Sequence, residues 1–318
     1  MAKKKSTKSR SLRWWKAKLF LAANLVLLLV GGGWYALQPP ERKTEVRTLL
    51  ANYAQRNRRI SLFEVARDIY TLYYSNAFVT CDYAAGENPV YGGAPIPRDY
   101  PGAIRVLFNR AYVVGYCDAR ENPAWVAYRL MDVSGDPSVA DRPDQFETDP
   151  RTVARVEHKD YTGSGYDRGH LAPNYGIARC FGAEAQVETF LMSNIVPQKH
   201  ELNAGPWKDL ELREALNYTG RFHEVWVIDG PLFHGPEERM RSGVPIPTAF
   251  YKIQVDEHKG RLRIQAFIMP QDADGGSSLS VMMTSVDEIE RLSGLDFFPD
   301  LDDTVENALE ATVPSRAW

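Results

Sequence analysis

The fold is decided by Tyr166-Asp167-Arg168-Gly169-His170, together with Ser193-Asn194-Ile195-Val196-Pro197-Gln198-Lys199 and Leu202-Asn203-Ala204-Gly205-Pro206-Trp207. These three segments predict a short pair of strands that leads into a helix. The arrangement brings together a histidine, an arginine and an amide oxygen. Those groups suit metal-assisted cleavage of a phosphodiester, which needs a base for water, a cation beside the phosphate and a hard ligand for a metal ion.

His170 is the candidate general base, because histidine has the side-chain pKa nearest neutrality. Arg168 is the candidate phosphate ligand, since a planar guanidinium can offset the charge of a pentacovalent transition state. We expect Gly169 to let the backbone turn tightly between them, and Asp167 to orient that turn or to pair with an arginine. For the other histidines we expect ordinary structural roles (His158, His200, His223, His234 and His258).

Asn203 is the candidate metal ligand, because Mg²⁺ prefers oxygen and usually keeps several waters. The alternative role is a helix N-cap, since Pro206 suits the first turn of a helix. Asn203, Trp207 and Glu211 are spaced at i, i+4 and i+8, roughly one helical stripe. That spacing favours the metal role and places the Glu211 carboxylate beside the ion, where it can orient or deprotonate a bound water. Trp207 is expected to pack.

These blocks resemble the DNA/RNA non-specific endonucleases with a ββα-metal (His-Me finger) site, the group that includes endonuclease G. Its members show a DRGH block, an S-N-x-x-P-Q block and an L-N-x-x-x-W-x-x-L-E block, which occur here in that order. The resemblance implies His170 as general base, Asn203 as the sole direct protein ligand of Mg²⁺, Glu211 as an outer-shell carboxylate and Asn194 as hydrogen-bonding support. It implies DNA and RNA as substrates, 5′-phosphate products, and Mn²⁺ as a possible substitute for Mg²⁺.

The implied fold is α+β, with a central mixed or antiparallel sheet flanked by helices and preceded by one transmembrane helix. The irregular order of strands and helices agrees with this class. A helix is expected to begin at Ser285 and to end at Gly294. Alternating patterns predict strands near 111–116, 125–130, 224–229, 249–255 and 263–269.

Two departures from the family pattern concern arginines. Members often carry an arginine four residues after the helix glutamate, and this chain has Ala215 there. Arg213 is nearby but lies off that helix face. Arg142 is the nearest candidate for a second arginine that family members place upstream of an F-x-x-D segment, here Phe146 to Asp149.

The N-terminus is basic and then apolar. Residues 1–18 contain eight Lys or Arg and no acid, and Leu19 to Leu37 is apolar enough and about long enough to cross a bilayer. The positive-inside tendency then predicts a signal anchor with the rest of the chain outside. We therefore expect a basic cytoplasmic tail, a transmembrane anchor, a stalk with a helical lead-in, and the endonuclease domain (1–18, 19–37, 38–103 and 104–318).

This topology predicts a single-pass protein of the bacterial inner membrane whose catalytic domain faces the periplasm. The alternatives are a mitochondrial inner-membrane protein facing the intermembrane space, and a secreted protein whose signal peptide is cleaved. The whole chain has a net charge of −3, and because its tail is so basic, the remainder is acidic. An acidic body disfavours tight, extended nucleic-acid binding but does not exclude cleavage.

Three cysteines make an odd set, from which we expect a Cys81–Cys117 disulfide and a free Cys180. A homodimer and an inhibitor partner remain open. The alternative function is a catalytically weak nuclease-like module that binds nucleic acid or a protein at the membrane. A zinc hydrolase ranks last, because no His, Cys or Asp cluster has zinc-like spacing.

Overall fold

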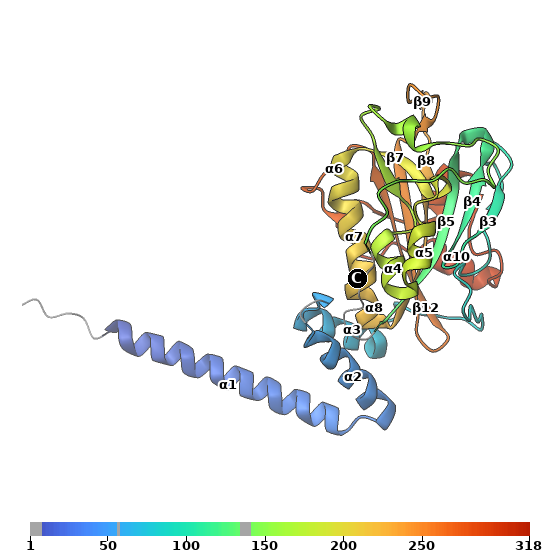
Figure 1. Cartoon of the computed structure of the whole chain (residues 1–318). Coiled ribbons are helices and arrows are strands. Elements are labelled where there is room, and N and C mark those ends of the chain that lie inside the picture. The colour runs from blue at the N-terminus through green and yellow to red at the C-terminus, as the bar shows by residue number, and fades with distance from the viewer. Residues whose placement is uncertain (1–7, 56–57, 134–140) are drawn as a thin grey trace, which may run out of the picture. The chain divides into compact units, whose positions relative to one another are not determined.

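The computed structural model of the chain describes residues 8–55, 58–133 and 141–318, with side chains from residue 14 onward. The chain forms two compact units, Met1–Ala54 and Gln55–Trp318 (Figure 1). The second unit includes most of the segment that was predicted as a stalk and lead-in before the endonuclease domain. Residues 58–103 belong to this unit, because strand pairs and buried ion pairs connect them to the rest of it.

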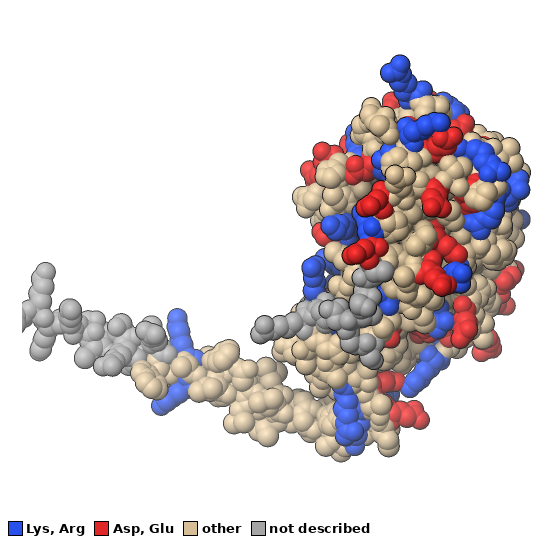
Figure 2. Space-filling model, viewed as in Figure 1, with Lys and Arg blue, Asp and Glu red and all other residues tan. Residues whose placement is uncertain are grey.

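The first unit consists of helices α1 (Lys8–Ala36) and α2 (Pro40–Tyr53). Within α1, Trp14–Ala36 has a mean hydropathy of 1.8 over its most apolar window, and none of that window is buried. Figure 2 shows few charged side chains along most of this helix. Its 23 residues are long and apolar enough to cross a membrane, a property that anchors share with signal sequences.

The second unit is built on one antiparallel sheet in the order β1-β12-β11-β8-β5-β4-β3, with β13 paired to β12. The five strands predicted from sequence are confirmed as β4, β5, β8, β11 and β12, so the fold is α+β as expected. The strands are β1 (Val79–Thr80), β3 (Arg105–Phe108), β4 (Tyr112–Cys117), β5 (Asn122–Met131), β8 (Glu224–Leu232), β11 (Ala249–Glu257), β12 (Arg261–Pro270) and β13 (Met283–Thr284).

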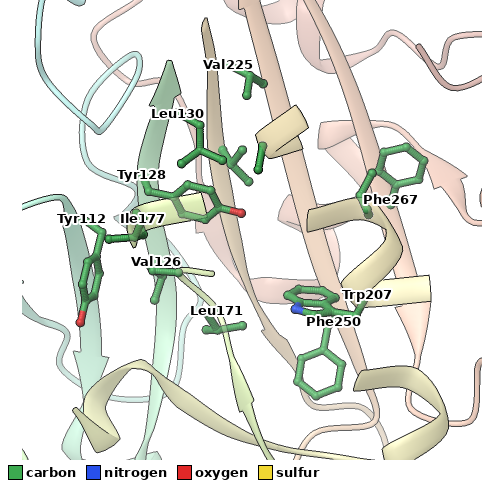
Figure 3. Close-up of a cluster of buried hydrophobic side chains, with 14 of the residues drawn as sticks. Tyr112, Val126, Tyr128, Leu130, Leu171, Ile177, Trp207, Val225, Phe250 and Phe267 are labelled. Carbon is green, nitrogen blue, oxygen red and sulfur yellow. The ribbon is translucent and has the colours of Figure 1, made fainter. Parts of the chain in front are cut away.

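Apolar side chains cover both faces of the sheet because successive residues of a strand point to opposite sides. Val126 and Tyr128 of β5 join one buried cluster, whereas Trp125 and Ala127 join the other. The first cluster is drawn in Figure 3, where Trp207 lies against Phe250. The helices that complete these layers include α4 (Asn174–Phe181), α5 (Ala183–Glu188), α9 (Val286–Ser293) and α10 (Asp303–Glu310).

Shorter elements border the sheet. The helix expected after Ser285 is α9: the Ser285 side chain accepts from the Glu288 backbone N–H, and Gly294 ends the helix with φ of 74°. The remaining short strands and 3-10 turns are β2 (Ile96–Pro97) with β14 (Leu295–Asp296), β9 (Glu238–Arg239) with β10 (Pro245–Ile246), η2 (Asp118–Arg120), η3 (His158–Tyr161), η4 (Met192–Asn194) and η7 (Leu279–Val281).

The expected Cys81–Cys117 disulfide is wrong, since all three cysteines lie in the described part of the chain and all are free thiols. Cys81 follows β1 at one edge of the sheet, and Cys117 ends β4 near the other edge. Four strands separate β1 from β4, which amounts to roughly 24 Å at the usual strand spacing. A disulfide requires Cα atoms about 4.4–6.8 Å apart.

The lead-in helix α3 (Leu62–Tyr74) is fixed to the body by a buried ion pair. A full capping box between Ser61 and Glu64 starts the helix. On its inner face, Asp68 accepts from Nε and Nη2 of Arg221, at 2.6 and 2.7 Å, and the two side chains are 2% and 0% exposed. Burial opposes the charge on Arg221, but the Asp68 carboxylate outweighs it and raises the arginine pKa.

Replacing Asp68 by asparagine is expected to lower the free energy of unfolding by about 3 kcal/mol, because a buried guanidinium then loses its carboxylate. Urea unfolding of the full chain in detergent measures this change. The matched control is Asp82→Asn, whose carboxylate is exposed. A loss within about 0.5 kcal/mol of the control would show that the ion pair does not hold the lead-in.

Candidate active site

The predicted strand pair and helix are present. Strands β6 (Asp167–His170) and β7 (Ile195–Gln198) pair antiparallel, with His170 opposite Ile195. The chain then continues through α6 (His200–Leu202), η5 (Asn203–Trp207), α7 (Lys208–Leu212), η6 (Arg213–Tyr218) and α8 (Thr219–Phe222). This ββα arrangement lies at the side of the large sheet (Figure 1).

The helix that follows the strand pair is irregular, which changes the predicted stripe. The segment η5 is interrupted by a kink at Gly205, whose φ and ψ of −102° and −118° are non-helical, and η6 is π-helical. Asn203 and Glu211 line one cavity, whereas Trp207 is buried in the core at 1% exposure. The three residues therefore do not share one face, because the kink at Gly205 changes the helical spacing between them.

One cavity of about 480 Å³ collects the candidate residues. Four of the five that were predicted line it (Arg168, His170, Asn203 and Glu211), and the fifth, Asn194, lies fully buried behind it. Residues without a predicted catalytic role complete the lining, among them Asp167, His200 and Lys208. Such a concave site with convergent polar groups and perturbed pKa values is the usual form of an active site.

His170 is held uncharged. Burial lowers its pKa to about 3, and the positive charge of Arg142 adds to this effect. Its Nε2 is buried and has no hydrogen-bond partner among the described residues. The rings of Phe190 and Phe146 lie 4.9 and 5.4 Å away, centre to centre. The imidazole is therefore a neutral proton acceptor at pH 7, and a phosphate anion entering the cavity would increase its basicity.

Two arginines face the same cavity. Arg168 donates from Nη2 to the His158 carbonyl oxygen at 2.6 Å and to Thr162 Oγ1 at 3.2 Å. No described residue forms a salt bridge with it, so its charge is available to an anion. Arg142 lines the cavity as well and lies 5.3 Å from the centre of the Phe190 ring.

Gly169 is needed for close packing, which differs from the expected tight turn. The residue lies inside β6 and its φ is not positive. A Cβ at this position would come within 2.0 Å of Gln198 Oε1 on the paired strand. Any larger residue would therefore have to displace the buried Gln198 side chain.

Asn194 supports the segment after His170 through three hydrogen bonds. Its Oδ1 accepts from the Ala172 backbone N–H at 2.8 Å, and its Nδ2 donates to the carbonyl oxygens of Ala172 and Thr189 at 3.0 and 2.9 Å. The backbone of Leu171 bonds the Asn194 carbonyl. These contacts hold the backbone that follows β6 in place, so the geometry of Asn194 is that of a residue that positions this segment.

Asp167 was expected to orient a turn or to pair with an arginine, and it does neither. Its Oδ2 accepts from Asn203 Nδ2 at 3.0 Å and lies 2.8 Å from His200 Nδ1. The partner differs because the helix, and not a loop, faces this strand end. Asn203 lies inside the helical segment, after its N-cap residue Leu202, and within the described part of the chain its side chain bonds Asp167 and caps no helix.

Glu211 is a buried carboxyl group beside the cavity. Burial raises its pKa to about 8, against the opposing attraction of Lys252. Its Oε1 has no hydrogen-bond partner among the described residues. Like His170 Nε2, this atom is a buried polar group that lacks its usual partner, and such atoms mark sites where a ligand or water completes the bonding.

Lys252 of β11 lies beneath the helix and is fully buried. Its Nζ donates to Asp229 Oδ2 at 2.5 Å and to Tyr128 Oη at 2.8 Å, and it lies 3.6 Å from Glu214 Oε1. Burial opposes its charge, but the neighbouring carboxylates outweigh this and raise its pKa. Burial also raises the pKa of Asp229 to about 7, although Lys252 opposes it.

The position four residues after Glu211, where family members often carry an arginine, faces the core in this chain. Ala215 is fully buried in η6 and contributes to the core. Arg213 is exposed and lines a neighbouring cavity, as its place off the predicted face suggested.

Sequence reasoning assigned no catalytic role to three residues that shape the site: His200, Lys208 and Lys252. His200 stands three positions before Asn203, so their proximity on one helical turn was the available signal. Lys252 carried no such signal, because its carboxylate partners come from distant segments.

Comparison with known proteins agrees with this geometry. Nuclease EXOG of human mitochondria is 34% identical over 214 residues, which cover 61% of this chain and 56% of that protein. A nuclease of Nostoc sp. is 30% identical over 223 residues, covering 65% of this chain and 78% of that protein. This chain spans less than six-tenths of the EXOG nucleases that it matches in Xenopus laevis, mouse and human.

Among solved structures, the crystal structure of a complex of EndoG with EndoGI is similar, with 28% sequence identity and a TM-score of 0.58. The match covers 64% of this chain and 89% of that chain. The family described as DNA/RNA non-specific endonuclease matches residues 96–304, well over half of the sequence. The matched range contains the strand pair, the helix and the cavity, and the chain belongs to the DNA/RNA non-specific endonuclease family.

Proposed function

We propose that the chain is a membrane-anchored endonuclease that hydrolyses phosphodiester bonds of DNA and RNA with Mg²⁺, for which Mn²⁺ can substitute. The observation that carries this proposal is the convergence in one cavity of an uncharged His170, the Asn203 amide, the Glu211 carboxyl group and Arg168, which forms no salt bridge with the described residues. The shared family supports the reaction class.

The donor set fits a hard, hydrated cation. Asp167 holds the amide nitrogen of Asn203, and no described residue bonds its amide oxygen, which therefore remains available as a ligand. Glu211 Oε1 is a buried oxygen without a partner and suits an outer-shell contact to bound water. When bound, the ion would stabilise the negative charge that develops on the leaving 3′ oxygen.

The chain's own residues perform the remaining tasks in this mechanism. His170 Nε2 takes a proton from the attacking water, which its neutral state allows. Arg168 offsets the charge on the phosphate oxygens, with Arg142 beside it. Asn194 keeps the end of β6 in place through its hydrogen bonds. The expected products carry a 5′-phosphate and a 3′-hydroxyl.

The apolar helix supports anchoring of the enzyme in a membrane. We propose a single pass through a bacterial inner membrane, with the nuclease on the periplasmic side. The mitochondrial nucleases among the relatives are compatible with the alternative location in the mitochondrial inner membrane. Protease accessibility of the nuclease body in intact spheroplasts and in intact mitoplasts would separate these locations.

His170→Ala is expected to lower the rate of plasmid and RNA cleavage by a factor of about 10³, because it removes the general base. Asn203→Ala should weaken activation by Mg²⁺, with a higher metal concentration needed for half-maximal rate. The measurement is cleavage by the full chain in detergent, with Mg²⁺ or with EDTA.

His258→Ala is the matched control, since His258 lies at the turn between β11 and β12. Cleavage that survives His170→Ala would place the base elsewhere. A folded wild-type chain that binds nucleic acid but cleaves neither polymer with any divalent ion would favour the binding-module function.

Glu211→Gln is expected to stabilise the metal-free chain at pH 9 and to leave it nearly unchanged at pH 4. The folded pKa of Glu211 is about 8, above its ordinary 4.5. Between these values the folded state holds the extra proton, so stability falls as pH rises and the full penalty applies above pH 8. The glutamine lacks this penalty.

Urea unfolding in EDTA across this pH range tests the shift, with the exposed Glu87→Gln as control. A Glu211→Gln chain that is less stable than wild type at pH 9 would contradict the raised pKa.

A further inference from the structure

A second cavity, of about 270 Å³, lies beside the active site, and Leu212 lines both cavities. One wall is the active-site helix, which contributes Asp209 and Arg213. The other wall is the lead-in, which contributes Arg58 and Arg59. The lead-in arginines stand outside residues 96–304, the range that matches the family.

Most charges in this cavity are already engaged. The Arg58 side chain is 1% exposed, forms an ion pair with Asp132 and donates to the Val133 carbonyl oxygen. Glu64 accepts from the Ser61 backbone and hydroxyl group at 2.7 Å each. The charge of Arg58 is therefore paired within the wall, whereas Glu64 shares the buried Arg221, 3.6 Å away, with Asp68.

Arg59 and Arg213 remain available. Both are exposed, and neither forms a salt bridge with any residue in the described part of the chain. The opposing charges in the lining are those of Glu64 and of Asp209, which lies one turn before Arg213 on the helix. The lining holds three arginines and two carboxylates, so its formal charge is +1, which suits a phosphate.

The backbone of Arg59 has a left-handed conformation, which holds this residue at the cavity. Its φ of 53° is in the left-handed region, which costs a non-glycine residue of the order of 1 kcal/mol. The conformation persists because Asn217 Nδ2 donates to the Arg59 carbonyl oxygen at 3.1 Å, while Arg58 and Ile60 on either side are buried. The lead-in is thus fixed where its arginine lines the cavity.

The helix runs from the active-site cavity to the second cavity. Lys208 lines the active-site cavity and Arg213 lines the second one. Five residues of helix rise about 7.5 Å. A nucleic-acid strand advances about 3.4 Å per phosphate along its axis, so this distance corresponds to roughly two nucleotides.

We propose that Arg59 and Arg213 form a second phosphate-binding subsite, which holds a backbone phosphate of the nucleic-acid strand about two nucleotides from the bond that is cut. This proposal rests on the proposed function, because the strand that the subsite binds is the substrate of the proposed endonuclease. It gives an acidic body a local basic contact, and it uses a segment that precedes the matched family range.

The test measures binding separately from cleavage. Full-length His170→Ala chain in detergent is titrated with a fluorescent 20-nucleotide single strand in EDTA, over a series of NaCl concentrations. Adding Arg59→Ala and Arg213→Ala should weaken binding about tenfold at low salt and reduce the salt slope by about 0.7 to 1. The matched control adds Arg98→Ala and Arg291→Ala, two exposed arginines that line neither cavity.

A second measurement uses the chain with His170 intact. The double substitution should raise KM for the 20-nucleotide strand and leave cleavage of a dinucleotide unchanged, because a dinucleotide is too short to reach the subsite. Equal losses in the double variant and the control, or an unchanged salt slope, would overturn the subsite. Binding that depends on both arginines in a wild-type chain that cleaves nothing would uphold the subsite while rejecting the proposed function.

Discussion

A single buried ammonium group, that of Lys252, joins the elements on which the active site is built. It bonds Asp229 of β8 and Tyr128 of β5, and it lies 4.3 Å from the centre of the Trp207 ring on the helix. A buried charge that loses its partners costs several kcal/mol, so these strands and the helix are held to one arrangement. His170 depends on the same point indirectly, because Trp207 Nε1 donates to its carbonyl oxygen at 3.1 Å.

The charges around Lys252 are unequal, and this has a consequence for the cavity. One lysine faces three carboxyl groups, those of Asp229, Glu214 and Glu211. Burial raises the pKa of Glu211 to about 8, so the metal-free protein holds a proton on this group at pH 7. A cation bound at Asn203 would supply the missing positive charge. Lys252 thus attracts the Glu211 carboxylate without offsetting the effect of its burial.

Local patterns predicted much of the fold and of the site, because they depend on neighbours in sequence. Alternation gave the five long strands, and the DRGH block gave the strand that carries Arg168 and His170. The rest depends on contacts between distant segments. Gly169 has no room for a side chain because it packs against Gln198, 29 positions later in the sequence. The Lys252 ammonium group can be buried because Asp229 and Tyr128 on neighbouring strands bond it. The predicted disulfide was wrong for the same reason, because the spacing of the cysteines in the sequence does not show how many strands lie between them.

The helix after the strand pair also connects the active site to the lead-in. In η6, Glu214 accepts from Tyr128 in the buried network, and Asn217 bonds the Arg59 carbonyl oxygen. Directly after it, Arg221 pairs with Asp68 of α3. Without residues 55–77, Arg221 would be a buried cation without its main carboxylate, on the helix that positions Glu211. The lead-in is therefore part of the support of the active site, which explains why it folds with the body although it lies outside the family pattern.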